Sequence, residues 1–288
     1  MISARLIISL QSKRLQSFAL RVADRMRLHR GTLPDFIILG AQKAGTTSLH
    51  AYLREHPDVL PCAWKEVHFF DGRNYRRGEA WYRRQFLNAD DLRALPKFRG
   101  RRLIGGEATP YYLFQPQVPE RIAKHVPKAK LIALLRNPIA RAYSQYQHNV
   151  RRDKEPLSFA DALKREDELL PLEHERKKAD PAYRSEAHHR FSYKLRGCYA
   201  EQIERYYRFF PREQLLIVKS EDLFERPQET YASILDFLDL PPFVLESVKA
   251  RNAGDYSARR IPEEDSLRRY FEPHNQRLYD LIGRDMGW

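Results

Sequence analysis

The segment that decides the fold is Asp35-Phe-Ile-Ile-Leu-Gly40, followed directly by Ala41-Gln-Lys-Ala-Gly-Thr-Thr-Ser48. The first six residues form a short, continuous apolar run, which is typical of a strand buried on both faces of a sheet. From Thr46 onward apolar residues recur at helical spacing, until the chain reaches His56-Pro57, where a helix should end. The sequence therefore predicts a strand, a tight loop and a helix in that order.

Further strands and helices follow the same alternation. Short apolar runs predict three more strands, at 103–106, 130–135 and 214–219. Helical patterns predict helices at 117–126, 138–150, 158–168, 196–210, 228–239 and 265–282. This alternation indicates an α/β fold with a central, mainly parallel sheet flanked by helices. Ligands in such folds bind beyond the carboxyl ends of the strands, which is where Gly40, Glu107 and Arg136 fall.

The composition is that of an ordinary globular protein with one large core. The chain has 288 residues, of which 42% are hydrophobic and 31% charged, and nothing requires a second full-sized domain. We expect one main domain over residues 35–288, preceded by a basic helical extension at 1–34. The charge-dense stretch 151–195 we expect to be an insertion or lid, either a solvated helical face or a set of acceptor-side helices.

The charge balance favours anionic ligands without choosing among them. The formal net charge is +13, so the surrounding field attracts a nucleotide, an acidic glycan, an anionic membrane or nucleic acid. A charge spread over the surface for solubility is the alternative. No nucleic-acid-binding motif occurs in the sequence, so we do not expect nucleic acid as a partner.

The cysteines and the N-terminus bear on the compartment. Cys62 and Cys198 have neither zinc-site nor disulfide-framework spacing, which suits a reducing compartment. The apolar run from Leu6 to Leu10 is far shorter than the ~20 residues of a membrane span, and no secretory cleavage site follows it. We expect a basic amphipathic helix over 4–30, which either packs on its own domain or rests on a membrane surface.

The loop after the first strand has the properties of an anion site. It precedes a helix N-terminus, where free N–H groups and the helix dipole favour a phosphate. Gly45 permits close backbone approach, and Lys43 adds a positive charge. The candidate binding residues here are Lys43, Ala44, Gly45, Thr46, Thr47 and Ser48. A kinase-like phosphotransferase is the alternative enzyme class for such a loop, and it would carry the pattern G-x-x-x-x-G-K-[ST]. That pattern is absent here, because the lysine precedes the last glycine.

At this loop the chain resembles a known family. The run Gly40-Ala-Gln-Lys-Ala-Gly-Thr-Thr47 is similar to the 5′-phosphosulfate loop of sulfotransferases that use 3′-phosphoadenosine-5′-phosphosulfate (PAPS), above all the heparan sulfate N-sulfotransferase and 3-O-sulfotransferase group. Similarity recurs at Glu66-Val-His-Phe-Phe70, Asn74-Tyr75, Trp81-Tyr82, Ala142-Tyr-Ser-Gln-Tyr-Gln-His148 and Gly197-Cys-Tyr-Ala200, and so spans roughly residues 35–288. The resemblance implies a three-layer fold similar to that of P-loop NTPases. It also implies PAPS as co-substrate, adenosine 3′,5′-bisphosphate (PAP) as product, and no metal.

A second anion site follows from Leu134-Leu-Arg136-Asn-Pro138. The arginine ends a predicted strand, and Ser144 lies two turns into the next helix, so a planar fork and a hydroxyl are both available to a phosphate. In the resembled family the arginine and serine of R-x-P-x-x-R-x-x-S hold the 3′-phosphate of PAPS. Arg136, Pro138, Arg141 and Ser144 reproduce that pattern.

A third nucleotide contact is less complete. The family's late K-G-R-x-x-P loop is similar to Ser257-Ala-Arg-Arg-Ile-Pro262, although the first lysine is missing. Either Arg259 or Arg260 supplies the charge there, or both are surface residues.

Sulfuryl transfer needs a base for the acceptor proton, as phosphoryl transfer does. Glu66 and His68 are two residues apart and therefore lie on one face of an extended segment. The resemblance places the family's catalytic glutamate at Glu66 and its phosphosulfate-contacting lysine at Lys43. His68 is either catalytic or structural. The candidate catalytic residues are thus Glu66, Lys43 and His68.

Gly106-Glu-Ala-Thr-Pro-Tyr111 resembles the family's E-K-[ST]-x-x-Y segment, with Ala108 in place of the lysine. Glu107 is then a second acid–base group or an ion-pair partner of a nearby arginine. The resemblance implies transfer to a hydroxyl or amine of an acceptor, and we expect an anionic or neutral glycan. Tyrosine, a lipid-linked sugar and a small alcohol stay open. The family's Golgi enzymes carry a membrane anchor, and the sequence predicts no membrane span here. We therefore expect a cytoplasmic, bacterial protein.

Overall fold

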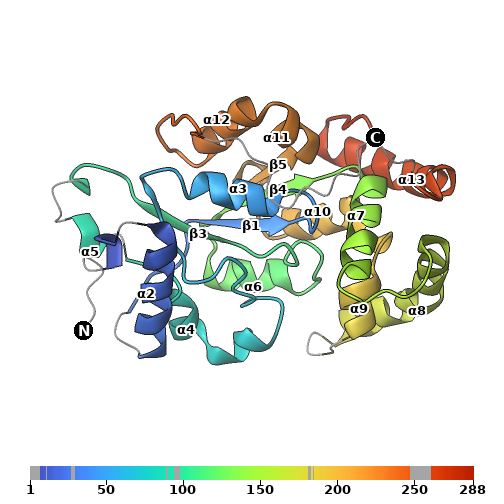
Figure 1. Cartoon of the computed structure of the whole chain (residues 1–288), viewed down its shortest axis with the longest axis horizontal. Helices are drawn as coiled ribbons and strands as arrows, with labels where there is room; N and C mark the ends of the chain where they lie inside the picture. The colour runs from blue at the N-terminus through green and yellow to red at the C-terminus, as the bar shows by residue number, and fades with distance from the viewer. Residues whose placement is uncertain are drawn as a thin grey trace.

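The computed structural model describes residues 7–10, 12–26, 30–88, 90–93, 98–180, 183, 185–246 and 261–288. At its centre lies a five-stranded sheet in the order β2-β3-β1-β4-β5, with every neighbouring pair parallel. The strands are β1 (Phe36–Gly40), β2 (Val59–Leu60), β3 (Ile104–Ala108), β4 (Lys130–Leu135) and β5 (Leu215–Lys219). Helices lie above and below this sheet in Figure 1, so the predicted three-layer α/β fold is confirmed.

The helices surround the sheet in chain order. They are α2 (Lys13–Arg25), α3 (Thr46–Leu53), α4 (Glu79–Arg83), α5 (Asp90–Arg93), α6 (Val118–His125), α7 (Pro138–Val150), α8 (Phe159–Ala179), α9 (Glu186–Phe191), α10 (Tyr199–Tyr207), α11 (Ser220–Glu225), α12 (Pro227–Phe237) and α13 (Glu264–Ile282). Short 3-10 turns occupy Arg73–Arg77, Leu195–Gly197 and Arg212–Gln214. The predicted helices all exist, although 196–210 is divided between a 3-10 turn and α10, and 158–168 is only the first half of α8.

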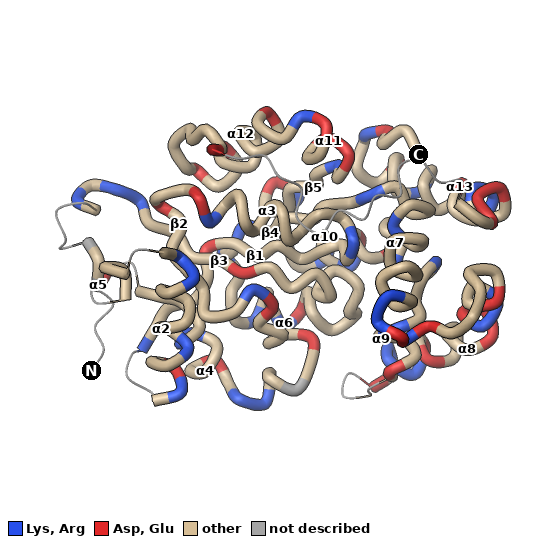
Figure 2. Tube along the Cα trace, in the orientation of Figure 1, with Lys and Arg blue, Asp and Glu red and all other residues tan. Residues whose placement is uncertain are grey.

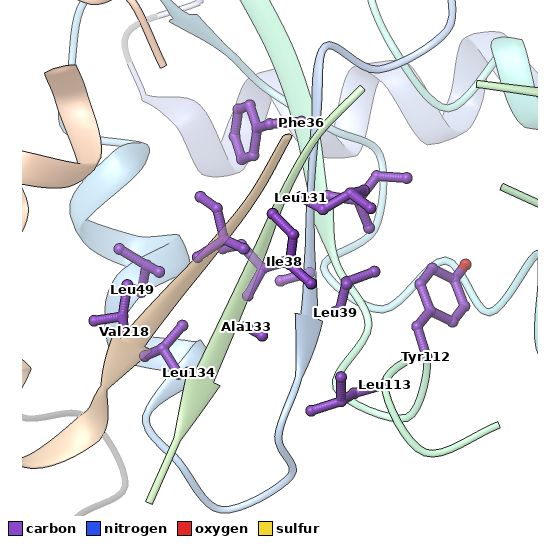
Figure 3. Packing of buried hydrophobic residues seen from close by; sticks show 14 of the residues in the cluster. Phe36, Ile38, Leu39, Leu49, Tyr112, Leu113, Leu131, Ala133, Leu134 and Val218 are labelled. Carbon is purple, nitrogen blue, oxygen red and sulfur yellow. The ribbon is translucent and has the colours of Figure 1, made fainter. Parts of the chain in front are cut away.

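Strands β1 and β4 form the centre of the core. All five residues of β1 are buried, and so are five of the six residues of β4, which explains why both segments are apolar without alternation. Figure 3 shows Leu39, Tyr112 and Leu113 on one side of the sheet and Leu49, Leu134 and Val218 on the other, so both faces of the central strands are covered by apolar side chains. Burying one such side chain contributes roughly 1.5–3 kcal/mol relative to exposure.

A close approach between β1 and β3 depends on a glycine. Phe36 is paired with Gly106, and a Cβ on Gly106 would lie 2.4 Å from the Phe36 ring. The missing side chain at Gly106 is therefore the space that the phenylalanine fills.

The N-terminal helix is shorter than predicted and packs on the domain. Residues 9, 10 and 12 form a turn rather than helix, so a single helix over 4–30 is wrong, and Ser12 caps α2 instead. The turn is stable because the Gln16 amide donates to the carbonyls of Ile8 and Leu10, at 3.2 and 3.0 Å. A second core cluster joins α2 to the sheet edge: Ile7, Ile8, Leu20, Ala23, Leu60, Ala63, Leu87, Leu92, Phe98 and Leu103. Within the described ranges, every helix is too short or too polar to cross a membrane.

The charge-dense stretch after α7 is more than a solvated face. It folds into α8 and α9, which lie together on the right in Figure 1. Glu166 of α8 is buried and accepts hydrogen bonds from the backbone N–H groups of Tyr193, Lys194 and Leu195 at 2.8, 2.7 and 2.9 Å. These bonds attach the helical pair to the chain that enters α10.

Candidate active site

The loop between β1 and α3 is held open by its backbone and by α11. Lys43 and Gly45 both have left-handed φ angles, +73° and +92°. A Cβ on Gly45 would lie 2.8 Å from the Phe224 ring, so only glycine fits there. The Ser220 hydroxyl donates to the Ala44 carbonyl at 2.8 Å and fixes the loop from below. No side chain caps the N-terminus of α3, whose N–H groups are thus left for an anion.

Lys43 lies in a strongly positive environment. Burial, followed by the charges of Arg151, Arg136, Arg152 and Arg141, lowers the pKa of Lys43 to about 8. A cation whose pKa is depressed in this way is stabilised by an incoming anion. The geometry therefore suits a phosphate or sulfate group.

The predicted second anion site lies beside the first. Arg136 follows β4, and its Nη1 donates to the Lys43 carbonyl at 3.0 Å. Asn137 caps α7 by accepting from the backbone N–H of Ile139 and Ala140, with Pro138 in the first turn. Ser144 is buried two turns further along α7. Arg136 and the Lys43 loop are thus joined directly, whereas Arg259 and Arg260 lie outside the described residues.

Arg141, the remaining charged residue of the R-x-P-x-x-R-x-x-S pattern, has a structural role. It is fully buried, and its guanidinium donates to the Gln145 side chain at 2.8 Å and to the Tyr193 carbonyl. It fastens α7 to the chain that enters α10 while adding positive charge behind the loop.

Glu66 and His68 are in contact, but the segment is not extended as predicted, because His68 has a left-handed φ of +50°. The structure also adds a third member. His68 Nε2 lies 3.3 Å from Glu66 Oε2, while His68 Nδ1 lies 2.7 Å from Asp71 Oδ2. Lys65 Nζ lies 2.8 Å from the other Glu66 oxygen. Asp71 is nearly fully buried and was not predicted; its signal in the sequence was only a carboxylate three residues after His68.

Contacts with their neighbours determine the charges of Glu66 and His68. Burial raises the pKa of Glu66, but hydrogen bonds to His68 and Lys65 outweigh it and lower that pKa to about 2. Burial lowers the pKa of His68, but its bonds to Asp71 and Glu66 outweigh it and raise that pKa to about 10. At neutral pH Glu66 is an anion held between two cations.

Glu107 is neither paired with an arginine nor open to a substrate. It is fully buried and accepts hydrogen bonds from the hydroxyls of Tyr82, Thr109 and Tyr112, at 2.6, 2.6 and 3.2 Å. Burial raises its pKa to about 7. Thr109 in turn accepts from the Val67 backbone N–H at 3.1 Å, so the network positions the segment that carries Glu66. Ala108, where the resembled family has a lysine, is fully buried.

Arg196, which sequence reasoning missed, is a buried cation beside the loop. Its guanidinium lies 5.0 Å from the ring centres of both Tyr111 and Phe114, and it donates to the Gln42 side chain and, at 2.8 Å, to the His189 carbonyl. Burial lowers its pKa to about 10. The residue joins the anion loop, the chain after β3 and helix α9. Its signal was its position directly before Gly197-Cys-Tyr-Ala200.

His148 of α7 was also missed as a site residue. Burial, followed by the charges of Lys43, Arg152 and Arg151, lowers its pKa to about 4. A neutral imidazole therefore borders the lysine loop, and its position within Ala142-Tyr-Ser-Gln-Tyr-Gln-His148 was the available signal.

Fold and loop together define a P-loop-like α/β protein with an anion cradle between its first strand and the following helix. The sulfotransferase domain family matches residues 33–255, and the chain belongs to this family of transferases. The resemblance found in the sequence is thereby confirmed.

Several similar proteins are named as sulfotransferases as well. The chain is 28% identical to the membrane-associated sulfotransferase kil1 of Dictyostelium discoideum, over 89% of this chain and 66% of that protein. It is 30% identical to the heparan sulfate glucosamine 3-O-sulfotransferase 6 of Mus musculus, over 96% and 79%. It is also 30% identical to the mouse bifunctional heparan sulfate N-deacetylase/N-sulfotransferase 4, over 88% of this chain but only 30% of that enzyme.

A solved structure supports the fold. The sulfotransferase of Alicyclobacillus acidocaldarius is 31% identical, with a TM-score of 0.66 over 88% of this chain and 97% of that one. Its likeness extends over nearly the whole of the compared chain.

Proposed function

We propose that this protein transfers the sulfuryl group of PAPS to a hydroxyl or amine of a carbohydrate and releases PAP. The observation that carries the proposal is the hydrogen bond from Arg136 to the Lys43 carbonyl, which joins two cationic sites at the carboxyl ends of β1 and β4. A nucleotide with phosphate-type groups at both its 5′ and 3′ ends is the ligand that such a pair of sites fits.

Each site has a role in donor binding. Lys43 and the first turn of α3, with Ala44, Gly45, Thr46, Thr47 and Ser48, hold the 5′-phosphosulfate. Arg136 and Ser144 hold the 3′-phosphate, and Arg259 or Arg260 closes over the nucleotide. PAPS supplies a sulfuryl group on a phosphate leaving group, and Lys43 neutralises the charge that develops on the bridging oxygen.

Glu66 is the base in this proposal. An acceptor hydroxyl or amine displaces Lys65 from the carboxylate and gives its proton to Glu66. Removing this cation raises the pKa of the carboxylate and makes it a stronger base. His68, which is held by Asp71, keeps the Glu66 carboxylate oriented toward the acceptor.

For the acceptor we propose a glycan. The two mouse relatives are named for heparan sulfate, and the net charge of +13 suits an acidic saccharide. Trp81 and Tyr82 are buried in the aromatic cluster around Phe69, so neither is available to an acceptor. Tyrosine and a lipid-linked sugar are the competing acceptors in a screen. We also propose a bacterial cytoplasm as the compartment, since both cysteines are free and buried.

Calorimetric titration tests donor binding. PAP should bind the wild-type protein in preference to ATP, and Arg136→Ala and Lys43→Ala should each weaken PAP binding at least tenfold. Arg208→Ala, which removes an exposed arginine on the C-terminal end of α10, is the matched control and should bind as the wild type does. Preference for ATP, or equal binding by Arg136→Ala, would refute the proposal.

Transfer is measured separately with radiolabelled PAPS and a panel of acceptors. Glu66→Gln should bind PAP normally and transfer nothing detectable. If only tyrosine peptides or lipid-linked sugars were labelled, the donor chemistry would stand and the glycan assignment would fall.

A further inference from the structure

Helix α2 has two apolar faces, and only one of them is used within the molecule. Leu20 and Ala23 point into the second core cluster. Leu15, Phe18 and Met26 remain 51%, 59% and 60% exposed. Their spacing of three and eight residues places them on one side of the helix, away from the buried face.

The exposed face continues onto the loop that follows β2. Trp64 is 50% exposed, and the Arg21 guanidinium lies 4.7 Å from its ring centre and 5.6 Å from that of Phe18. Arg21 also donates to the Ala63 carbonyl at 2.9 Å, which fixes helix and loop together. Leu15, Phe18, Met26 and Trp64, with Arg21 between the two rings, form one surface, called here the α2–Trp64 patch.

Basic residues line one flank of this patch. Arg14, Arg21 and Arg25 recur at intervals of seven and four, and therefore share one side of α2. Figure 2 shows basic segments along this helix. Its one acidic residue, Asp24, is turned inward and paired with Arg84 at 3.0 Å.

We propose that the α2–Trp64 patch docks on an anionic lipid surface. A helix with aromatic and aliphatic side chains beside arginines lies in the plane of a membrane interface, with its apolar residues in the headgroup region. Tryptophan favours this depth, and arginines are attracted to anionic headgroups. A second copy of the chain is a poorer occupant, because two such patches would oppose their arginines.

The contact is peripheral and independent of the proposed chemistry. Among the described helices none is suited to span a membrane, and the patch carries none of the residues assigned to donor binding or proton transfer. The docking surface can therefore be tested whatever the acceptor proves to be.

Vesicle co-sedimentation of the full chain is the test. Phosphatidylcholine vesicles with about one third phosphatidylglycerol should bind the protein, and pure phosphatidylcholine vesicles should not. The double variant Leu15→Gln/Phe18→Gln should lower the partition coefficient at least tenfold. The variant Arg14→Gln/Arg25→Gln should lower it about fivefold per charge at low salt.

Matched controls separate the patch from general surface properties. Phe209→Gln removes a phenylalanine of similar exposure (47%), and Lys128→Gln/Arg208→Gln removes two exposed charges elsewhere. Both controls should bind vesicles as the wild type does, and every variant should keep its thermal midpoint and PAP affinity.

Three outcomes would overturn the proposal. One is no binding to anionic vesicles. The second is equal loss in the patch and control variants, which would indicate only general charge attraction. The third is a concentration-dependent dimer abolished by Leu15→Gln/Phe18→Gln, which would assign the patch to a second copy.

Discussion

Lys43 has a charge that depends on its ligand. Its pKa of about 8 in the free protein reflects burial and four nearby arginines, so a bound dianion should raise it. Above pH 8 the free lysine loses its proton and binding must restore it. We expect PAP affinity to fall by up to about tenfold per pH unit above 8, and binding at pH 8.5 to take up about 0.8 proton.

Calorimetry in two buffers of different ionisation enthalpy measures this uptake. The phosphates of PAP are fully ionised at that pH, because their second pKa is about 6, and contribute nothing. Lys43→Arg keeps the charge and cannot titrate, so its binding should be independent of pH from 8 to 9.5. Equal proton uptake by Lys43→Arg would show that another group is responsible.

Asp71 is a positioning residue for His68. Asp71→Asn removes the carboxylate 2.7 Å from Nδ1, so we expect the pKa of His68 to fall from about 10. The protonated imidazole would then be lost at a lower pH, and kcat should decline with it while the KM for PAPS stays unchanged. NMR titration of the imidazole and a pH profile of turnover measure the two effects.

The matched control is Glu79→Gln, which removes a carboxylate 2.9 Å from a different histidine, His125. It should alter neither the His68 titration nor turnover. A normal pH profile in Asp71→Asn would leave Asp71 with a purely structural role.

At the residue scale, local spacing allowed several site residues to be proposed from the sequence. Lys43, Gly45, Glu66 and Arg136 occupy short patterns whose neighbours define them, and the structure brings Arg136 to the lysine loop. The contact of Arg196 with Gln42 could not be predicted, because the two residues lie 154 positions apart in the chain.

Gly45 decides the shape of the element that follows β1. Gly45→Ala would be strained by the positive φ and would meet the Phe224 ring at 2.8 Å. We expect a loss of stability of about 2–4 kcal/mol, which adds an overpacking cost of about 1–3 kcal/mol to a backbone cost of about 1 kcal/mol, together with weaker PAP binding. Urea unfolding and calorimetry measure the two losses.

Gly283→Ala provides the comparison, because Gly283 has a left-handed backbone like Gly45, with a φ of +67°, and open space around its Cβ position. It should cost about 1 kcal/mol and leave PAP affinity intact. If both variants lost equal stability, the Phe224 contact would not matter.

Arg196 connects the anion loop to α9. Arg196→Lys keeps the charge but loses the planar fork that reaches both Gln42 and His189, and each lost bond to a charged group contributes about 1.5–3 kcal/mol. We expect the amides of α9 to exchange hydrogen at least tenfold faster. Hydrogen-exchange mass spectrometry over 185–192 measures it.

Arg212→Lys is the control for the Arg196 variant. Arg212 also lies over an aromatic ring, Tyr207 at 4.5 Å, and donates to the Leu281 carbonyl, yet it lies outside the site. Its substitution should leave exchange in α9 unchanged, and faster exchange in both variants would indicate a general loss of stability.

Most strands could be predicted from the sequence, whereas elements that depend on contacts with distant parts of the chain could not. Strands β1, β3, β4 and β5 agree with the predicted ranges within two residues. The agreement is best explained for β1 and β4, which are buried apolar runs. Strand β2 has two residues and no periodicity, so only its pairing with β3 defines it. Helix α8 continues through Pro171 to Ala179, supported by packing that its sequence does not reveal.

The whole molecule carries an excess of positive charge. Figure 2 shows basic and acidic segments interspersed over the molecule, and the sequence has 51 Lys and Arg against 38 Asp and Glu, a net charge of +13. Such a field accelerates the encounter with a polyanion and hardly affects a neutral sugar. We therefore expect kcat/KM for an acidic glycan to fall about tenfold between 50 and 200 mM salt, as the Debye length shortens.

Steady-state kinetics with an acidic oligosaccharide and its neutral counterpart, both at saturating PAPS, tests this expectation. Saturation removes the salt dependence of donor binding, so the difference between the two acceptors isolates the acceptor encounter. A steep slope for the acidic substrate alone would mean that the long-range charge selects the acceptor. Equal slopes would mean that selection belongs to contacts near Glu66 and that the surplus charge serves another surface, such as the α2–Trp64 patch.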